Sequence, residues 1–281
     1  MNQELRDAIE LLERSGFSVS EKRLDEGIDI DYEDRRVIYN SSHQKNVDTS
    51  IENNPTIDDS VLKGVSVWSV FKRKLGGLFD GNPLIYALKG EKGWKFRSEY
   101  DKLQIVHQFE SIAEKFVNSH GFDISIIIPS TNSLNRYIAD TVVSKADGDV
   151  RVLEDVVRKL TVDEVEDIIQ HPKSKFFRVY GRDENMLNEL GRYFDDMRRY
   201  KKGVFVRHMV KDQEIRELLD LTMKLSEDKY AEYANYINGH DVLIIDDTIS
   251  RGQSISEMLN IIKTSYAPRS ITVLTLMSKL Y

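Results

Sequence analysis

Short, nearly continuous runs of apolar residues recur in the second half of the chain. They cover residues 123–128, 242–245 and 270–276, and the first of them ends at Pro129. Runs of this length without alternation are typical of strands that are buried on both faces of a parallel sheet. Between them, residues 133–145 and the residues after the second run carry apolar side chains at helical spacing. This pattern predicts an α/β fold, with a parallel sheet flanked by helices.

The same reasoning predicts the remaining elements. Helical spacing predicts helices over residues 3–14 and 101–117, and an apolar and basic stretch over 61–90 predicts two short helices around a turn. Short apolar runs predict strands over 36–39 and 149–153. Each predicted helix has an expected inward face. These faces are, for 3–14, Leu5, Ala8, Ile9 and Leu12; for 101–117, Leu103, Val106, Phe109, Ala113 and Phe116; for 133–145, Leu134, Tyr137, Ile138, Thr141 and Val142; and for the helix after the run at 242–245, Ile255, Met258, Leu259 and Ile262.

Composition divides the chain into two unequal parts. Residues 40–60 are polar and rich in Asn, Ser and Asp, which predicts a loop or linker. We therefore expect a small N-terminal extension over 1–60 and one α/β domain over 61–281. Within that domain, residues 154–235 are charged and are predicted to form a mostly helical insert.

The charge balance and the absence of cysteine exclude several classes of function. The 281 residues include 40 Lys and Arg against 47 Asp and Glu, a net charge of -7, whereas nucleic-acid-binding domains usually carry a basic surplus. Without cysteine there is no disulfide, thiolate metal site, iron–sulfur cluster or cysteine nucleophile. The N-terminus is charged, and no apolar stretch approaches the roughly 20 residues that span a bilayer. We therefore expect a cytoplasmic protein that makes no membrane contact.

The segment that carries chemistry is VLIIDDTISRGQSI, residues 242–255. Asp246 and Asp247 follow four branched apolar residues, so two carboxylates are predicted at the carboxyl end of a strand, where parallel sheets bind ligands. Small and hydroxyl-bearing residues come next at the start of a helix, where free N–H groups bind anions such as phosphate. Gly252 allows close approach or a positive φ. This combination suits a sugar phosphate; the alternative is that the two acids only cap the following helix.

The segment resembles the phosphoribosyl diphosphate (PRPP) motif of type I phosphoribosyltransferases, which has four apolar residues, two acids and a small-residue loop. The resemblance implies the type I phosphoribosyltransferase fold, with Asp246 and Asp247 as catalytic residues that hold the ribose hydroxyls. It also implies Mg²⁺ as the cofactor, held through the substrate rather than by direct protein ligands. Arg251 departs from the pattern, because many members have Thr or Gly there. The residues that would surround the 5′-phosphate are Thr248, Ile249, Ser250, Arg251, Gly252, Gln253 and Ser254.

A second loop is similar to the diphosphate loop of the same family. It follows the run at 123–128, and the residues expected to bind diphosphate are Ser130, Thr131, Asn132, Ser133 and Arg136. The alternative is a plain helix cap by Thr131 or Ser133. Over residues 80–281 the order of motifs, with Leu88 and Lys89 in a helix before the first strand, looks like that of ComF-type phosphoribosyltransferase-like proteins. Their cysteine-based zinc ribbon is missing here.

A basic cluster lies in the predicted insert, ahead of the main motif: Arg192, Arg198, Arg199, Lys201, Lys202, Arg207, His208 and Lys211. In the family, a mobile loop at this point closes over the diphosphate and shields the reaction from water. The simpler interpretation is a solvated helix face with salt bridges to Asp195, Asp196 and Asp212. Lys89, similarly, either reaches a phosphate or is an ordinary surface lysine.

Three functions remain open from the sequence. The first is an Mg-dependent phosphoribosyltransferase that binds PRPP or a nucleotide containing ribose 5-phosphate, with an unknown acceptor. The second is a catalytically silent regulatory or accessory protein that senses such a compound, of the competence or phage-defence type. The third is a scaffold that binds protein or nucleic acid through the helical insert; a homo-oligomer is compatible with all three. We expect no base-binding hood after residue 276, so residues 154–235 or the N-terminal region would recognise the acceptor.

Overall fold

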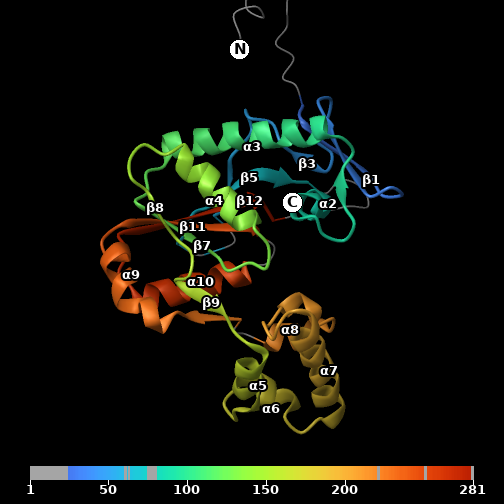
Figure 1. Ribbon diagram of the computed structural model, residues 1–281, viewed down its shortest axis with the longest axis vertical. Coiled ribbons are helices and arrows are strands. Elements are labelled where there is room, and N and C mark those ends of the chain that lie inside the picture. The colour runs from blue at the N-terminus through green and yellow to red at the C-terminus, as the bar shows by residue number, and fades with distance from the viewer. Residues whose placement is uncertain are drawn as a thin grey trace, which may run out of the picture.

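The chain folds into an α/β lobe, built on one large sheet, and a smaller helical lobe (Figure 1). The computed structural model describes residues 25–59, 62, 64–74, 81–219, 222–249 and 252–279. The helix expected over 3–14 lies outside these residues. Within the described part of the chain, no helix combines the length and the apolar character needed to cross a membrane.

The large sheet has a parallel centre and an antiparallel extension. Its strands are β1 (Gly27–Asp31), β2 (Arg36–Asn40), β3 (Val47–Asp48), β4 (Thr56–Ile57), β5 (Val67–Arg73), β6 (Lys95–Phe96), β7 (Ile124–Ile127), β8 (Arg151–Leu153), β11 (Asp241–Thr248) and β12 (Ser270–Met277). Their order is β6-β2-β1-β3-β5-β12-β11-β7-β8, with β4 also paired to β5. The five strands from β5 to β8 in this order are mutually parallel, whereas β1, β3 and β4 pair antiparallel with their neighbours.

Helices cover both faces of the parallel centre, as the apolar runs predict. They are α2 (Asn82–Lys89), α3 (Glu99–Ser119) and α4 (Leu134–Ser144) on one face, and α9 (Tyr230–Ile237) and α10 (Gln253–Ser265) on the other. Along β11, Leu243 and Ile245 pack toward the first group, and Val242 and Ile244 pack toward the second. Because all four side chains are almost completely buried, each contributes about 1.5–3 kcal/mol to folding.

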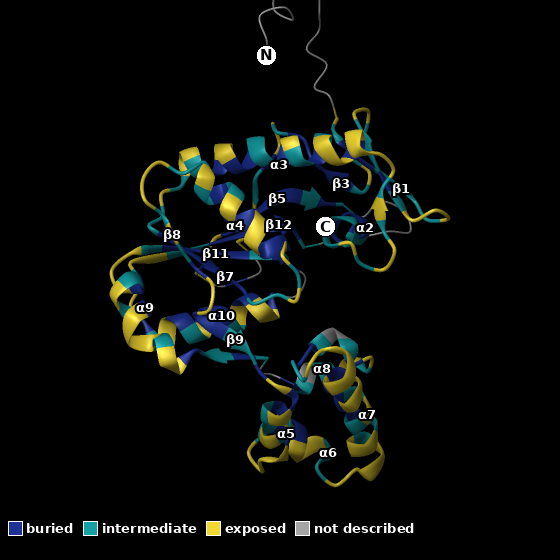
Figure 2. Cartoon of the chain, viewed as in Figure 1, coloured by how far each residue is buried: buried dark blue, intermediate teal, exposed yellow. Residues whose placement is uncertain are grey.

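The helical lobe has a hydrophobic core of its own. Its helices are α5 (Val162–Gln170), α6 (Lys175–Tyr180), α7 (Glu184–Tyr200), α8 (Gln213–Leu218) and the 3₁₀ helix η1 (Arg207–Met209). Phe176, Phe194 and Phe205 are its largest fully buried side chains, while the outer surface is mostly exposed (Figure 2). Helices therefore predominate in residues 160–219, the central part of the predicted insert over 154–235, and this part is a separately packed unit.

Two antiparallel strands, β9 (Val157–Lys159) and β10 (Met223–Leu225), connect the helical lobe to the sheet lobe. The sequence did not reveal this ribbon. Glu257 on α10 accepts hydrogen bonds from the backbone N–H groups of Thr222 (2.5 Å) and Met223 (2.7 Å), which fastens β10 to α10. The connection to the helical lobe therefore packs directly on the helix that follows β11.

Two predictions in the first half of the chain are wrong. Only the second of the two helices predicted over 61–90 exists, as α2, because β5 pairs along its length with β12 and its β-branched and aromatic residues are buried in the sheet. The predicted loop over 40–60 contains β3 and β4, both of which pair with β5. Its polar residues are partly buried and bond one another: Asp48 accepts a hydrogen bond from the Ser50 hydroxyl at 2.6 Å.

The inward faces of two helices are also shifted from the predicted ones. On α3 the buried stripe runs through Ile105, Phe109, Ile112 and Phe116, and Leu103 is 56% exposed. On α4, Leu134, Ile138 and Val142 are buried as predicted, but Tyr137 is 40% exposed, whereas Asn135 is fully buried. The predicted face of α10 is correct throughout.

The separate core of the helical lobe generates a prediction. Phe194→Ala is expected to cost about 3–5 kcal/mol within that lobe, because it leaves a cavity among buried aromatic side chains. Hydrogen exchange measured by mass spectrometry should accelerate over residues 160–219 and stay unchanged in the strands of the large sheet. The matched control, Ile262→Ala under α10, should produce the opposite distribution. Equal acceleration in both lobes of the Phe194→Ala protein would contradict the assignment of two cores.

Candidate functional site

The centre of the sheet contains a topological switch point. β7 and β11 are parallel neighbours, with Ile126 opposite Ile244. From β7 the chain continues through α4 to β8, and from β11 it continues through α10 to β12, on the other side of the pair. Because α4 and α10 pack on opposite faces of the sheet, the carboxyl ends of β7 and β11 diverge into two loops. Ligands of open α/β sheets bind in the crevice at such a point.

The two predicted acids lie at this point. Asp247 is 8% exposed, Asp246 is half-buried, and the Asp247 N–H donates a hydrogen bond to Asp246 Oδ1 at 2.9 Å. Asn135, at the start of α4, donates from Nδ2 to the Ile128 carbonyl at 3.0 Å and to Asp246 Oδ1 at 3.2 Å. The buried amide therefore links the end of β7 to the first acid of the pair, a contact that the sequence did not predict.

Two lysines from distant segments accompany the acids. Lys89, the last residue of α2, places Nζ 2.7 Å from Asp247 Oδ2, and both side chains are largely buried. Lys159, the last residue of β9, is partly buried; desolvation lowers its pKa, while the charges of Asp246 and Asp247 raise it. Lys89 is thus no ordinary surface lysine, and Lys159 is a site residue that the sequence analysis did not identify.

Burial and mutual repulsion change the acidity of Asp246. Desolvation, the largest cause, and the neighbouring charge of Asp247 together raise its pKa to about 7, against the hydrogen bonds from the Asp247 N–H and from Asn135 and the charge of Lys89. Perturbed carboxyl groups in a crevice are a common feature of functional sites. Two acids that serve only as a helix cap would be solvated, so the burial and the two lysines argue against that alternative.

The predicted phosphate loop follows directly. The buried Thr248 Oγ1 has no hydrogen-bond partner among the described residues, and Gly252 adopts φ 70° at the N-cap of α10, the positive φ that the sequence predicts. Gln253 and Ser254 are exposed in the first turn of that helix. Ile249 instead buries its side chain in the core, and its N–H donates to the Met277 carbonyl at 3.1 Å. Ser250 and Arg251 lie outside the described residues.

The predicted diphosphate loop faces the same edge of the sheet, because it follows β7. Asn132 Oδ1 accepts from the Leu134 N–H at 3.0 Å and so caps α4, whereas Ser133 makes no side-chain cap bond. Ser130 is partly exposed, and Thr131 is exposed. Arg136 is directed to Asp140, at 2.8 Å, and to Glu154, away from the acid pair. Among the described residues, Lys89 contacts the pair directly and Lys159 is close enough for the charges of both acids to affect its pKa.

Two arginines of the basic cluster, Arg198 and Arg207, are engaged within the helical lobe, Arg207 by donating to the Arg216 carbonyl. Arg198 forms ion pairs with Asp163, Glu166 and Asp195, of which only Asp195 is among the predicted partners. Lys201 is close enough to Lys159 to lower its pKa. The interpretation as a salt-bridged helix face therefore fits Arg198, and Lys201 is the cluster member whose charge reaches the site.

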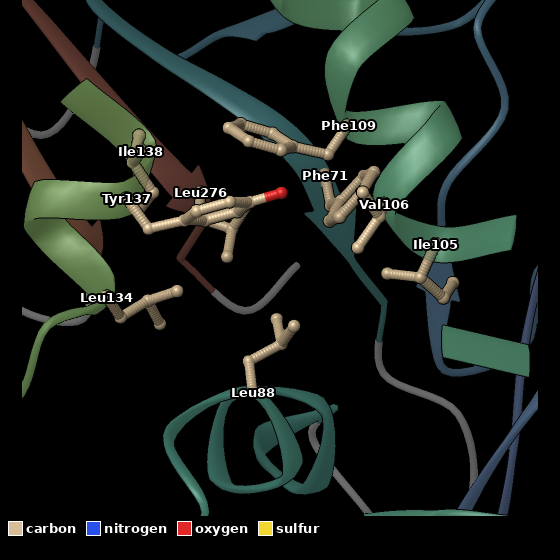
Figure 3. A pocket seen from close by; sticks show the side chains of 9 residues that line it. All are labelled: Phe71, Leu88, Ile105, Val106, Phe109, Leu134, Tyr137, Ile138 and Leu276. Atoms are coloured by element: carbon tan, nitrogen blue, oxygen red, sulfur yellow. The ribbon is translucent and has the colours of Figure 1, made fainter. Parts of the chain in front are cut away.

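Two cavities lie outside the acid pair. The first, between α2, α3 and α4, has a free volume of about 10 Å³, room for about one water molecule and too little for a nucleobase. Its lining is apolar apart from the Tyr137 hydroxyl (Figure 3): Phe71, Leu88, Ile105, Val106, Phe109, Leu134, Tyr137, Ile138 and Leu276. The second, of about 300 Å³, lies between α5, α6 and α7 in the helical lobe. Neither contains a residue of the predicted site.

Among the described residues, no three His, Asp or Glu side chains are grouped closely enough to hold a metal ion by themselves. A cation at the acid pair would need oxygen ligands from a bound substrate or from water. No protein-family model matches this sequence, and no curated protein sequence matches it either.

The raised pKa of Asp246 predicts a pH-dependent effect on stability. The carboxylate form of Asp246 is disfavoured in the folded protein. The contribution of Asp246 to the free energy of unfolding is therefore fully present below about pH 4 and is lost as the pH rises toward 7. Asp246→Asn should therefore raise the melting temperature by a few degrees at pH 8 and leave it unchanged at pH 4, measured by scanning calorimetry.

Asp241, on the same strand, provides a control of opposite sign. Its hydrogen bonds from Arg269 and Ser270 lower its pKa to about 2, so its contribution to stability is present above pH 4 and is lost as the pH falls toward 2. Asp241→Asn should lower the melting temperature at pH 8. A lower melting temperature for Asp246→Asn at pH 8 would contradict the assignment of a repelled carboxylate at position 246.

Proposed function

We propose that this protein binds PRPP, or a nucleotide that contains ribose 5-phosphate, at the carboxyl ends of β7 and β11. The observation that carries the proposal is the position of Asp246 and Asp247 beside the N-terminus of α10, where the buried Thr248 hydroxyl lacks a partner. Carboxylates accept hydrogen bonds from sugar hydroxyls, and the N-terminus of a helix attracts phosphate. A five-carbon sugar phosphate has both groups at its two ends.

The cations of the site support the same class of ligand. PRPP carries a diphosphate in addition to its 5′-phosphate, and a chain of net charge -7 needs local positive charge to bind it. Lys89 and Lys159 provide that charge next to the acid pair. The hydroxyl and amide groups of the loop after β7 lie on the same edge and would meet the diphosphate.

Mg²⁺ fits the donor set as an ion that arrives with the substrate. It prefers oxygen ligands and usually keeps several waters, with one or two carboxylates and substrate phosphates completing the shell. Asp246 is the carboxylate available for it, because Asp247 already pairs with Lys89. When bound, the ion neutralises part of the diphosphate charge. A cation beside Asp246 would also relieve its repulsion from Asp247.

Thermal stabilisation by ligand tests the proposal. PRPP with Mg²⁺ at about 100 times its dissociation constant should raise the melting temperature by about 5–10 °C. The double substitution Asp246→Asn/Asp247→Asn should abolish this shift, and EDTA should weaken it. Glu114→Gln, at an exposed acid on α3, should leave the shift intact. A wild-type protein that shows no shift with PRPP, ribose 5-phosphate or nucleotides would refute the proposal.

A sensor that binds the ligand without turnover is the second candidate. It is favoured by the Lys89–Asp247 ion pair, which occupies one of the two acids that a transferase uses to hold the ribose. Diphosphate release from PRPP, measured over a panel of bases and amines, separates the two. A sensor binds PRPP and releases no diphosphate with any acceptor, whereas a transferase releases it with at least one, and Lys89→Met should then change the rate.

A further inference from the structure

Arg73 is a buried cation that connects its own strand to three other segments of the chain. It is the last residue of β5, and it is only 4% exposed. Its Nη2 donates to the Ile249 carbonyl at 2.7 Å, and its Nη1 donates to Asn82 Oδ1 at 3.0 Å. Its Nε donates to the carbonyl of Ser278, whose hydroxyl accepts from the Arg73 N–H at 2.8 Å. A single guanidinium thus joins β5, α2, the segment after β12 and the loop after β11.

Two of these contacts reach parts of the candidate site. The Ile249 carbonyl belongs to the loop between Thr248 and Gly252, which the proposed function assigns to the 5′-phosphate. Asn82 is the first residue of α2, and the last residue of that helix is Lys89, which pairs with Asp247. The guanidinium has a rigid fork of donors, so it fixes the distance between its acceptors in a way that a lysine cannot.

The charge of Arg73, like its hydrogen-bond geometry, favours an anion near Ile249. A guanidinium is always protonated, and burial in the protein interior strengthens its electrostatic interaction with an anion nearby. A buried cation behind the loop therefore favours an anion in front of it. Replacing it with lysine keeps the charge but loses the fork, so the two effects can be separated.

We infer that Arg73 is a positioning residue of the phosphate site: it fixes the backbone at Ile249, which follows the Thr248 hydroxyl and precedes the N-terminus of α10 in the chain, so that these groups can meet a phosphate. This inference rests on the proposed function. It adds to the site a residue that lies 176 positions before Ile249 in the chain, on a different strand from the acid pair. Arg73 acts through Ile249 and Asn82 and is not itself expected to touch the ligand.

The test compares Arg73→Lys and Arg73→Gln with the wild-type protein and with Arg158→Lys. Arg158 is a control because it lies on β9 and pairs with Glu164 through a similar fork. Affinity for ribose 5-phosphate is measured by calorimetry, and the titration of Asp246 is followed by carboxyl ¹³C NMR. We expect at least a tenfold loss of affinity in both Arg73 variants, with the Asp246 titration unchanged, and no loss of affinity in Arg158→Lys.

The combined readout separates positioning from general loosening, because disruption of the whole site would also return the Asp246 titration to its ordinary range. If Arg73→Gln does not fold, the test uses Arg73→Lys together with a milder variant, Asn82→Ala. We expect Asn82→Ala to lose two- to fivefold in affinity for ribose 5-phosphate. Wild-type affinity in Arg73→Lys and Asn82→Ala would overturn the inference, as would a parallel shift of the Asp246 titration. A wild-type protein that binds no ribose 5-phosphate would refute the proposed function instead.

Discussion

The parallel pairing of β7 with β11 is the constraint on which the rest of the structure depends. It buries the apolar runs of both strands between helices on two faces, and it sends the chain in opposite directions at their carboxyl ends. The loops that follow are therefore close at their origins and free to diverge. Asn135 and Asp246, separated by more than a hundred residues in sequence, meet there because their strands are neighbours. Any ligand of this edge contacts the start of α4 and the start of α10 together.

The acid pair works against the stability of the fold. Asp246 carries a raised pKa because burial and Asp247 both disfavour its charge, against the hydrogen bonds from the Asp247 N–H and from Asn135 and the charge of Lys89. A packed sheet edge without a ligand would be more stable with neutral residues there. Natural proteins depart from local stability mainly where function demands it. The physical cost of the pair is therefore itself an argument that this edge binds something positively charged or rich in hydroxyl groups.

The sequence predicted the parts of the fold that depend on local pattern. β7, β11, β12 and α10 follow from apolar runs and helical spacing, and Asp246 and Asp247 follow from their place at the end of such a run. β5 was predicted as a helix. Its strand conformation depends on its pairing with β12 and β3, and the spacing of its apolar residues does not reveal that pairing. Leu103 was assigned to the core for a similar reason: two overlapping apolar stripes on α3 fit the helical period, and only packing selects the one through Ile105 and Ile112.

The cations of the site were hardest to predict, and they are the means by which an acidic chain could present the phosphate site that we propose. Arg73, Lys89 and Lys159 come from β5, α2 and β9; Arg73 lies in the basic run Lys72–Lys74, but nothing in that run distinguishes it from its two neighbours. In the basic cluster of the helical lobe, by contrast, Arg198 forms ion pairs with acids of the same lobe. Net charge describes the surface as a whole, whereas a small anion responds to charges within about one Debye length, roughly 8–10 Å. The three cations, brought from remote segments by the fold, would therefore affect a ligand at this edge more than the total charge of -7 does.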